Sequence, residues 1–210
     1  MTSAPVRIAG ILLAAGASRR FGAANKLLSE IDGAPLIRRS AEALISTQAL
    51  APLVVVVRPG ADDVRAALAG LPVLFAVNAD ADEGIASSIR TGLRSIEDDA
   101  RAVLIAQADM PNLTARSIAA LATAFVARAG NAIVAPRGPS GRIGTPIIWP
   151  ASDRPHLAAL TGDTGARPLV QARRDAIVTV DVSDDAAFAD IDTPADLAAW
   201  RQTQGLADDD

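Results

Sequence analysis

The chain of 210 residues is long enough for one large domain or two small ones, and 50% of its residues are hydrophobic against 21% charged. Its formal net charge of −4 argues against nucleic acid as a main partner. With no cysteine and a single histidine, the chain excludes a disulfide framework, a thiolate nucleophile and a multi-histidine zinc site. Any metal is therefore expected to be a hard cation held by carboxylates and phosphates.

The sequence also limits where the protein is expected to work. No apolar run approaches the roughly 18 residues of a membrane-spanning helix, and the first residues lack the pattern of a secretion signal. We therefore expect a cytoplasmic protein with no membrane partner. No low-complexity linker or internal repeat interrupts the chain, so residues 1–210 are expected to form a single domain, with 1–6 and 204–210 frayed.

The predicted elements alternate between strands and helices. Apolar runs of the kind expected for strands buried on both faces cover 8–15 and 53–57, and further strands are predicted at 73–77, 101–106, 132–135, 145–149 and 177–182. One helix is predicted to begin near Pro35, and five others are predicted at 62–68, 84–96, 114–128, 165–174 and 194–200. A short extended segment is expected at 27–31, and the Gly- and Pro-rich stretch 136–144 is predicted to be a loop or lid without regular structure. The alternation predicts an α/β fold: a three-layer, doubly wound, mostly parallel sheet of Rossmann-like type.

The first predicted strand leads into a loop of small and basic residues. Residues 16–18 are small, so their backbone N–H groups can approach a ligand closely. Two arginines and Lys26 follow within ten residues of Gly16. Amide donors beside concentrated positive charge suit a polyphosphate, because the amides bind its oxygens and the cations offset its charge. We interpret the stretch as a phosphate-binding loop; the alternative is a flexible turn with two solvated arginines.

Two carboxylates are expected at the same edge of the sheet as this loop. Asp109 follows the predicted strand at 101–106, and Asp192 follows the strand at 177–182. Ligands of open α/β sheets bind beyond the carboxyl ends of the strands, so the two carboxylates are placed to hold Mg²⁺ between the protein and a polyphosphate. The alternatives are a turn-forming role for Asp109 and a helix-capping role for Asp192.

Several segments of the chain, in the same order, resemble those of a known enzyme family. The run from Leu13 to Gly22, together with Lys26, looks like the signature loop of the nucleotidyltransferases, and it is similar to that of the MobA-like group, which attaches a nucleotide to the molybdenum cofactor. Further similar segments follow in the same order at 78–88, 109–111, 144–146, 162–167 and 190–194. The resemblance implies a nucleotide-diphospho-sugar transferase-like fold. It also implies a reaction in which an acceptor's phosphate oxygen attacks the α-phosphate of a nucleoside triphosphate and releases pyrophosphate.

The resemblance further implies which residues form the site. Catalytic roles go to Arg20, Lys26 and Asp109, with Mg²⁺ as cofactor and Asp109 and Asp192 as its ligands. The nucleotide is expected to contact Leu13, Ala14, Ala15, Gly16, Ser18, Arg19, Arg20, Lys26, Asn78 and Ser88. The acceptor is expected to contact Gly144, Thr145, Asp163 and Arg167, although plain loop and helix roles fit Asp163 and Arg167 equally well.

Two positions bear on the identity of the substrates. Loops of the guanylyltransferase branch tend to contain Leu-Ala-Gly-Gly, whereas those of the cytidylyltransferase branch contain Ala-Ala-Gly, as residues 14–16 do here. Ala15 thus stands where the guanine branch has glycine, and its methyl group would crowd a purine, which favours CTP over GTP. Thr145 stands where the cytidylyltransferases have the histidine of Gly-His-Pro, a difference that bears on the acceptor more than on the reaction.

The leading hypothesis is therefore an Mg²⁺-dependent cytidylyltransferase acting on molybdopterin, with a molybdenum hydroxylase as a further expected partner that receives the product. A guanylyltransferase, a transferase for another small phosphorylated acceptor, and a non-catalytic chaperone for the finished cofactor remain open. The set of Arg20, Lys26, Asp109 and Asp192 favours catalysis, because a carrier needs no metal–triphosphate site. A nicotinamide-binding protein is disfavoured, since the loop lacks Gly-x-Gly-x-x-Gly and Arg58 follows the second strand in place of an acidic residue.

Overall fold

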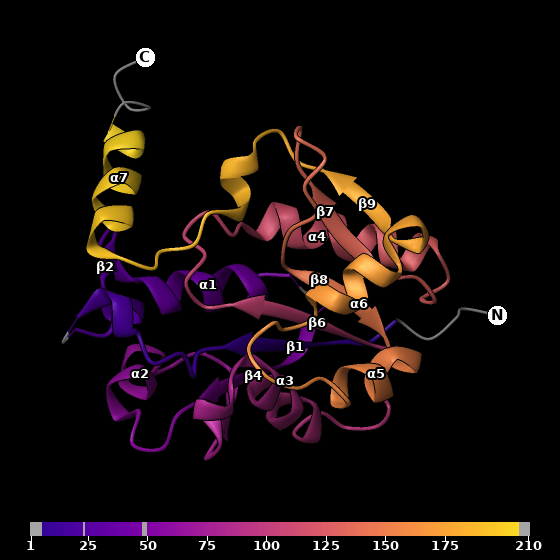
Figure 1. Cartoon of the computed structure of the whole chain (residues 1–210), viewed down its shortest axis with the longest axis horizontal. Helices are drawn as coiled ribbons and strands as arrows, with labels where there is room; N and C mark the ends of the chain where they lie inside the picture. Colours follow the sequence, from indigo (N-terminus) through magenta and orange to yellow (C-terminus); the bar gives the residue numbers. More distant parts are fainter. Residues whose placement is uncertain (1–5, 23, 48–49, 206–210) are drawn as a thin grey trace.

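A computed structural model describes residues 6–22, 24–47 and 50–205 (Figure 1). Its centre is a seven-stranded sheet in the order β5-β4-β1-β6-β8-β7-β9. The strands are β1 (Ile8–Leu13), β4 (Leu50–Val57), β5 (Val73–Val77), β6 (Ala102–Gln107), β7 (Val134–Arg137), β8 (Ile147–Pro150) and β9 (Val178–Asp181). Strands β5, β4, β1 and β6 are mutually parallel, β8 is antiparallel to both of its neighbours, and β7 is parallel to β9. The predicted mostly parallel sheet is confirmed.

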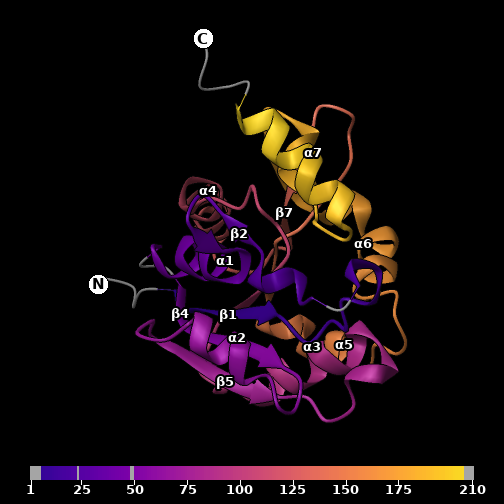
Figure 2. The same cartoon turned by 90° about the vertical axis from the view of Figure 1, so that its left-hand side faces the viewer.

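Helices cover both faces of the sheet and complete the three layers (Figures 1 and 2). The helices are α1 (Leu36–Ile45), α2 (Asp62–Ala67), α3 (Ile85–Arg94), α4 (Ala115–Ala127), α5 (Arg154–Ala158), α6 (Arg167–Ala172) and α7 (Pro194–Gly205). One apolar core lies between the sheet and α1, α2 and α4, and a second lies between the sheet and α3, α5 and α6. A small cluster joins α7 to the hairpin of β2 (Glu30–Ile31) and β3 (Ala34–Pro35).

Strand β1 shows why the apolar runs form this sheet. All six of its residues are buried, with Ile8 and Leu12 in one core and Ile11 and Leu13 in the other. Successive side chains of a strand point to opposite faces, so a strand between two helical layers needs apolar residues at every position. The central strand is therefore held from both faces, and its carboxyl end, where the Gly16 loop begins, is fixed in place.

The structure corrects the sequence predictions mainly at element ends. Residues 136–144 were expected to lack regular structure, but Pro136 and Arg137 belong to β7, and Arg137 pairs with Ile143. Proline has no backbone N–H to donate, but the Pro136 carbonyl accepts a hydrogen bond from the Gly144 N–H at 3.0 Å. Pro136 therefore takes part in pairing through its carbonyl alone. In the expected extended segment 27–31, only Glu30–Ile31 form a strand, because Lys26–Leu28 form a 3₁₀ turn, η2.

The C-terminal helix is longer than the sequence indicated, since α7 continues to Gly205 instead of ending at Trp200. The predicted fraying at 1–6 and 204–210 falls largely on residues outside the described ones and stays a prediction, as does the single-domain boundary. Among the described residues, no helix combines the length and apolar character needed to cross a membrane.

Candidate active site

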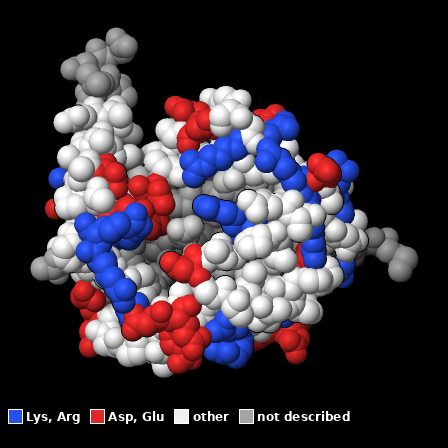
Figure 3. All heavy atoms as spheres, viewed as in Figure 1, with Lys and Arg blue, Asp and Glu red and all other residues white. Residues whose placement is uncertain are grey.

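A cavity of about 370 Å³ lies at the carboxyl edge of β1, β4 and β6. Most of the predicted nucleotide-binding residues line it, together with the two predicted metal ligands: Leu13, Ala14, Ala15, Gly16, Ser18, Arg19, Arg20, Lys26, Ser88, Asp109 and Asp192. The hollow is visible on the face in Figure 3, where basic and acidic side chains lie next to one another around it. The topology therefore brings together loops that are far apart in the sequence.

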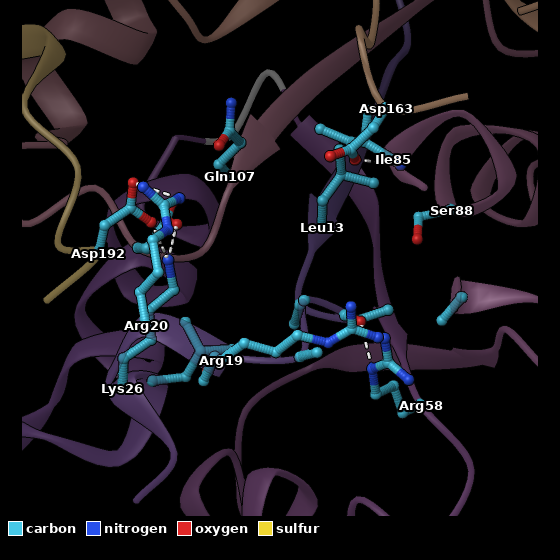
Figure 4. A pocket seen from close by; sticks show the side chains of 18 of the residues that line it. Leu13, Arg19, Arg20, Lys26, Arg58, Ile85, Ser88, Gln107, Asp163 and Asp192 are labelled. Carbon is cyan, nitrogen blue, oxygen red and sulfur yellow. Dashed lines mark hydrogen bonds and ion pairs between the residues drawn. The ribbon is translucent and has the colours of Figure 1, made fainter. Parts of the chain in front are cut away.

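Lys26 is the centre of the charged cluster on one side of this cavity. Its Nζ lies 2.6 Å from Asp109 Oδ2 and 2.8 Å from Asp192 Oδ1. The second oxygen of Asp192 pairs with Arg20 at 2.8 Å, as the dashed lines in Figure 4 indicate. The side chains of Lys26 and Asp109 are only 10% and 13% exposed, so water screens this pair little.

Burial and charge act in opposite directions on these groups. For Lys26, burial lowers the pKa, but the attraction and hydrogen bonds of Asp109 and Asp192 outweigh burial and raise it. For Asp109, burial raises the pKa of the carboxyl group, and Lys26 offsets this only in part. Lys26 therefore keeps its proton, while the fold resists a full negative charge on Asp109.

Backbone contacts explain why Asp109 and Asp192 meet. The N–H of Ala108 donates to the Leu13 carbonyl at 3.1 Å, which ties the loop after β6 to the end of β1. The N–H of Ile191 donates to the Asp109 carbonyl at 2.9 Å, which ties the loop before α7 to the same point. Two main-chain hydrogen bonds thus place both carboxylates beside the Gly16 loop.

Helix capping at α7 is performed by other residues than Asp192. The Asp196 carboxylate accepts from the Thr193 N–H at 2.7 Å, and the Thr193 hydroxyl accepts from the Asp196 N–H at 3.1 Å. This reciprocal pair is a capping box. The side chain of Asp192 is consequently left to pair with Lys26 and Arg20, so the alternative of a capping role for Asp192 is wrong.

The two carboxylates fit a divalent cation by their donor chemistry. Within the part of the chain that the structure describes, the buried Oδ1 of Asp109 has no hydrogen-bond partner, which leaves this carboxylate oxygen as an unused donor for a cation. Hard cations such as Mg²⁺ take carboxylate and phosphate oxygens. Among the described residues, no group of three or more His, Cys, Asp or Glu side chains is arranged to hold a metal, so the remaining ligands must come from phosphate or water.

Comparison with known proteins identifies the family. The family model described as "MobA-like NTP transferase domain" matches residues 10–177, which include the Gly16 loop, Lys26 and Asp109. The chain belongs to the MobA-like NTP transferase family. It is accordingly a nucleotidyltransferase. Asp192 lies beyond the matched residues, and its place in the site of this MobA-like protein rests on its contacts with Lys26 and Arg20.

Named relatives extend the likeness over most of the chain. A molybdenum cofactor guanylyltransferase from Cereibacter sphaeroides is 30% identical over 196 residues, covering 92% of this chain and 95% of that protein. A protein named nicotine blue oxidoreductase from Paenarthrobacter nicotinovorans is 29% identical over 192 residues, covering 89% and 92%. The crystal structure of a homologue of the Mycobacterium tuberculosis protein rv0371c, from Mycobacterium sp. strain JC1, has a TM-score of 0.80 at 25% identity, covering 95% of this chain and 98% of that one.

Several predicted residues of this MobA-like protein lie outside the cavity. Asn78 is buried, and its amide nitrogen donates to the hydroxyls of Ser87 and Ser88 at 2.9 and 3.0 Å. Its amide oxygen accepts from the Asp80 N–H, so Asn78 holds Ser88 in position without itself lining the cavity. Its expected contact with the nucleotide stays a prediction that this placement does not favour.

The four predicted acceptor residues are not brought together. Asp163 lines the cavity, where it accepts from the Ile85 N–H at 3.1 Å and caps α3 (Figure 4). Thr145 lines a second cavity of about 370 Å³, and Gly144 packs against the Phe188 ring. Arg167 begins α6 and lines neither cavity. Of the acceptor set, only Asp163 faces the same space as the Gly16 loop.

Sequence reasoning missed other residues that line the cavity. Gln107 is the last residue of β6, Arg58 directly follows β4, and Asp82 lies on the 3₁₀ turn η3 (Ala81–Glu83). Gln107 and Arg58 share a signal that was available beforehand: each stands at the carboxyl end of a strand next to β1. Asp82 gave no such signal, because it lies on a turn that depends on tertiary packing.

Proposed function

We propose that this nucleotidyltransferase transfers CMP from CTP to the phosphate of molybdopterin, using Mg²⁺ and releasing pyrophosphate. The observation that supports it most is the meeting of Lys26 with Asp109 and Asp192 beside the loop of residues 14–18, which lines the same cavity. This arrangement offers both cations for a triphosphate and carboxylate oxygens for its metal. In the reaction, an oxygen of the acceptor phosphate forms a bond to the α-phosphorus while the bond to pyrophosphate breaks.

Each residue of the charged cluster then has one task. Arg20 and Lys26 bind triphosphate oxygens and offset the charge that develops on the leaving pyrophosphate. Asp109 and Asp192 hold the metal, which supplies further charge neutralisation at the phosphates when it is bound. Backbone groups of residues 14–18 line the nucleotide, and Ser88 faces the same cavity from α3. Catalysis here consists of positioning and electrostatic stabilisation, because the bond exchange needs no covalent intermediate with the protein.

The proposal of CTP over GTP rests on Ala15. This residue lines the cavity and is 4% exposed, so its methyl group has no free space to move into. A purine is larger than a pyrimidine, and a methyl group in a packed wall acts against the larger base. GTP is the alternative base, since the Cereibacter relative is named a guanylyltransferase.

The acceptor proposal is supported by fewer cavity residues than the nucleotide proposal. Asp163 is the residue that supports an acceptor site beside the nucleotide, while Gly144, Thr145 and Arg167 stay predictions. Molybdopterin is proposed because the named relative acts in molybdenum cofactor guanylylation, as its name states. A molybdenum hydroxylase that receives the product remains an expectation from the sequence.

The experiment that tests the proposal measures pyrophosphate release. The protein is incubated with Mg²⁺, molybdopterin and one of CTP, GTP, ATP or UTP, and the product is identified by mass. The proposal expects CTP to give the fastest release and a product larger than molybdopterin by one cytidylyl group. Equal rates with GTP would overturn the base assignment, and release that does not depend on molybdopterin would overturn the acceptor. No release with any nucleotide, together with tight binding of the finished cofactor, would favour the chaperone.

A further inference from the structure

Arg58 is held at the nucleotide cavity by two defined contacts. Its Nε donates to the main-chain carbonyl of Ala15 at 2.7 Å, and its Nη2 bonds to Asp82 Oδ1 at 3.0 Å. The same Asp82 oxygen lies 3.4 Å from a guanidinium nitrogen of Arg19. Figure 4 shows the side chains of Arg19 and Arg58 meeting at one corner of the cavity. One carboxylate therefore joins the loop after β1 to the end of β4.

These contacts fix the peptide between Ala15 and Gly16. The Ala14 N–H donates to the Val56 carbonyl at 2.9 Å, which extends the pairing of β1 with β4 one residue beyond the end of β1. Arg58 then holds the carbonyl of Ala15, the following residue. Because the peptide group is planar and trans, a fixed Ala15 carbonyl also fixes the direction of the Gly16 N–H.

The loop has few other means of keeping this peptide in place. Residues 14–18 are small, and a Cβ added to Gly16 would meet no heavy atom of the described residues within 4 Å. Hydrogen bonds from a charged guanidinium are stronger than neutral ones, so Arg58 supplies an anchor that the loop's own side chains lack. The hydrogen bond and charge of Arg58 also lower the pKa of Asp82, which keeps its carboxylate ionised and able to orient Arg58.

We propose that Arg58, oriented by Asp82, is a positioning residue that fixes the Ala15–Gly16 peptide and thereby determines which nucleotide base the cavity selects. The inference rests on the proposed nucleotidyl transfer, but it does not depend on which base the protein prefers. Bases differ in the donors and acceptors on their edges, and a peptide held in one orientation presents a fixed pattern to them. Release of the Ala15 carbonyl lets the peptide turn and offer its oxygen to an exocyclic amino group, so discrimination between bases falls.

The test compares nucleotide selection in Arg58 variants. Kd values for CTP and GTP are measured by calorimetry with Mg²⁺, and kcat and KM by pyrophosphate release, for the wild type, Arg58→Gln, Arg58→Lys and Asp82→Asn. We expect Arg58→Gln to reduce the ratio of the two affinities about fivefold, the worth of one lost hydrogen bond. KM should rise while kcat stays within about twofold, because a positioning contact that acts through binding leaves the chemical step unchanged. Arg58→Lys should regain part of the discrimination, and Asp82→Asn should shift it in the same direction as Arg58→Gln but less.

A matched control is available in Arg65. This arginine lies on α2, stacks on the Phe75 ring at 4.6 Å and lines neither cavity. Arg65→Gln should leave the affinity ratio unchanged. An unchanged ratio in folded Arg58→Gln, or a fall in kcat at constant KM, would overturn the proposal; if Arg58→Gln does not fold, Arg58→Lys carries the same comparison. A wild type that prefers GTP would instead refute the proposed base and leave the change in ratio fully measurable.

Discussion

At the scale of single residues, the site depends on Lys26, whose ammonium group pairs with two carboxylates at once. Its ammonium group lies between two carboxylates, one of which is almost buried, and an arginine binds the outer oxygen of the second. A triphosphate entering this cavity offers phosphate oxygens to Lys26 and Arg20. When Lys26 and Arg20 bind phosphate oxygens, the carboxylates of Asp109 and Asp192 become available to the metal. Without a ligand, the two cations Lys26 and Arg20 thus offset the two carboxylates Asp109 and Asp192.

Replacement of Lys26 tests this balance through stability. In Lys26→Met the two carboxylates lose their shared cation, and we expect unfolding free energy to fall by about 3 kcal/mol at pH 8. Without Lys26, burial and the charge of Asp190 are left to raise the pKa of Asp109 further above its ordinary value. An acid whose pKa is higher in the folded state destabilises the fold as pH rises, so the loss should be smaller at pH 5 than at pH 8.

Urea unfolding at the two pH values measures the effect. Arg65→Met, which removes a cation away from the cavity, is the matched control and should show no comparable pH dependence. Equal losses for Lys26→Met at pH 5 and pH 8 would contradict the shared role of Lys26.

At the scale of elements, the N-terminus of α3 is joined to the loop at residues 162–163. The Gly162 carbonyl accepts from the Ala86 N–H at 3.2 Å, and Asp163 caps the Ile85 N–H. Gly84 precedes the helix with φ at +101°, and a Cβ there would lie 2.6 Å from the Gly162 oxygen. This close approach of two backbones requires a glycine.

Two glycine substitutions distinguish the stability cost of a steric clash from the cost of a strained backbone conformation. Gly70 also has a positive φ, +82°, but a Cβ there would meet no atom of the described part of the chain within 4 Å. We expect Gly70→Ala to cost about 1 kcal/mol through strain alone. Gly84→Ala should cost about 2 kcal/mol more, because the loop must move away from the helix. Chemical denaturation and nucleotide titration measure both effects, and only Gly84→Ala should weaken nucleotide binding; equal costs would show that the Gly162 contact is unimportant.

The sequence predicted the elements well where local patterns determine them. Unbroken apolar runs located the central strands β1 and β4, and Thr114 located the start of α4, where its side chain does accept from the Ser117 N–H. Residues 136–137 and the 3₁₀ turn at Lys26 escaped prediction, because pairing with β9 and packing against α1 and α2 decide their conformation. For the site, residues next to β1 were predictable from the strand ends. The place of Arg58 at a strand end was therefore readable, but its contact with the Ala15 carbonyl and the place of Asp82 were not, since both depend on contacts across the cavity.

At the scale of the whole molecule, the cavity draws residues from distant parts of the chain. The loop after β1, the end of β6 and the segment before α7 all contribute charged or polar side chains. A ligand that contacts all three binds the folded chain and has no comparable site in the unfolded chain. Binding is therefore linked to global stability.

This linkage gives a prediction for thermal unfolding. CTP with Mg²⁺ at about one hundred times its Kd should add roughly 2.7 kcal/mol to stability, which for a chain of this size raises Tm by about 5 to 10 °C. Scanning calorimetry measures the shift. Asp109→Asn should show a much smaller shift with CTP and Mg²⁺ together. A full shift in Asp109→Asn would contradict the assignment of Asp109 as a metal ligand.

The most direct test of nucleotidyl transfer at this site is the rate of pyrophosphate release in Asp109→Asn. The variant keeps the shape of the side chain but removes the charge that would hold the metal. Asp175→Asn is the matched control, because Asp175 is exposed and lines neither cavity. We expect Asp109→Asn to lose at least about a hundredfold in kcat while remaining folded, and Asp175→Asn to match the wild type. Pyrophosphate release at the wild-type rate by folded Asp109→Asn would contradict the account.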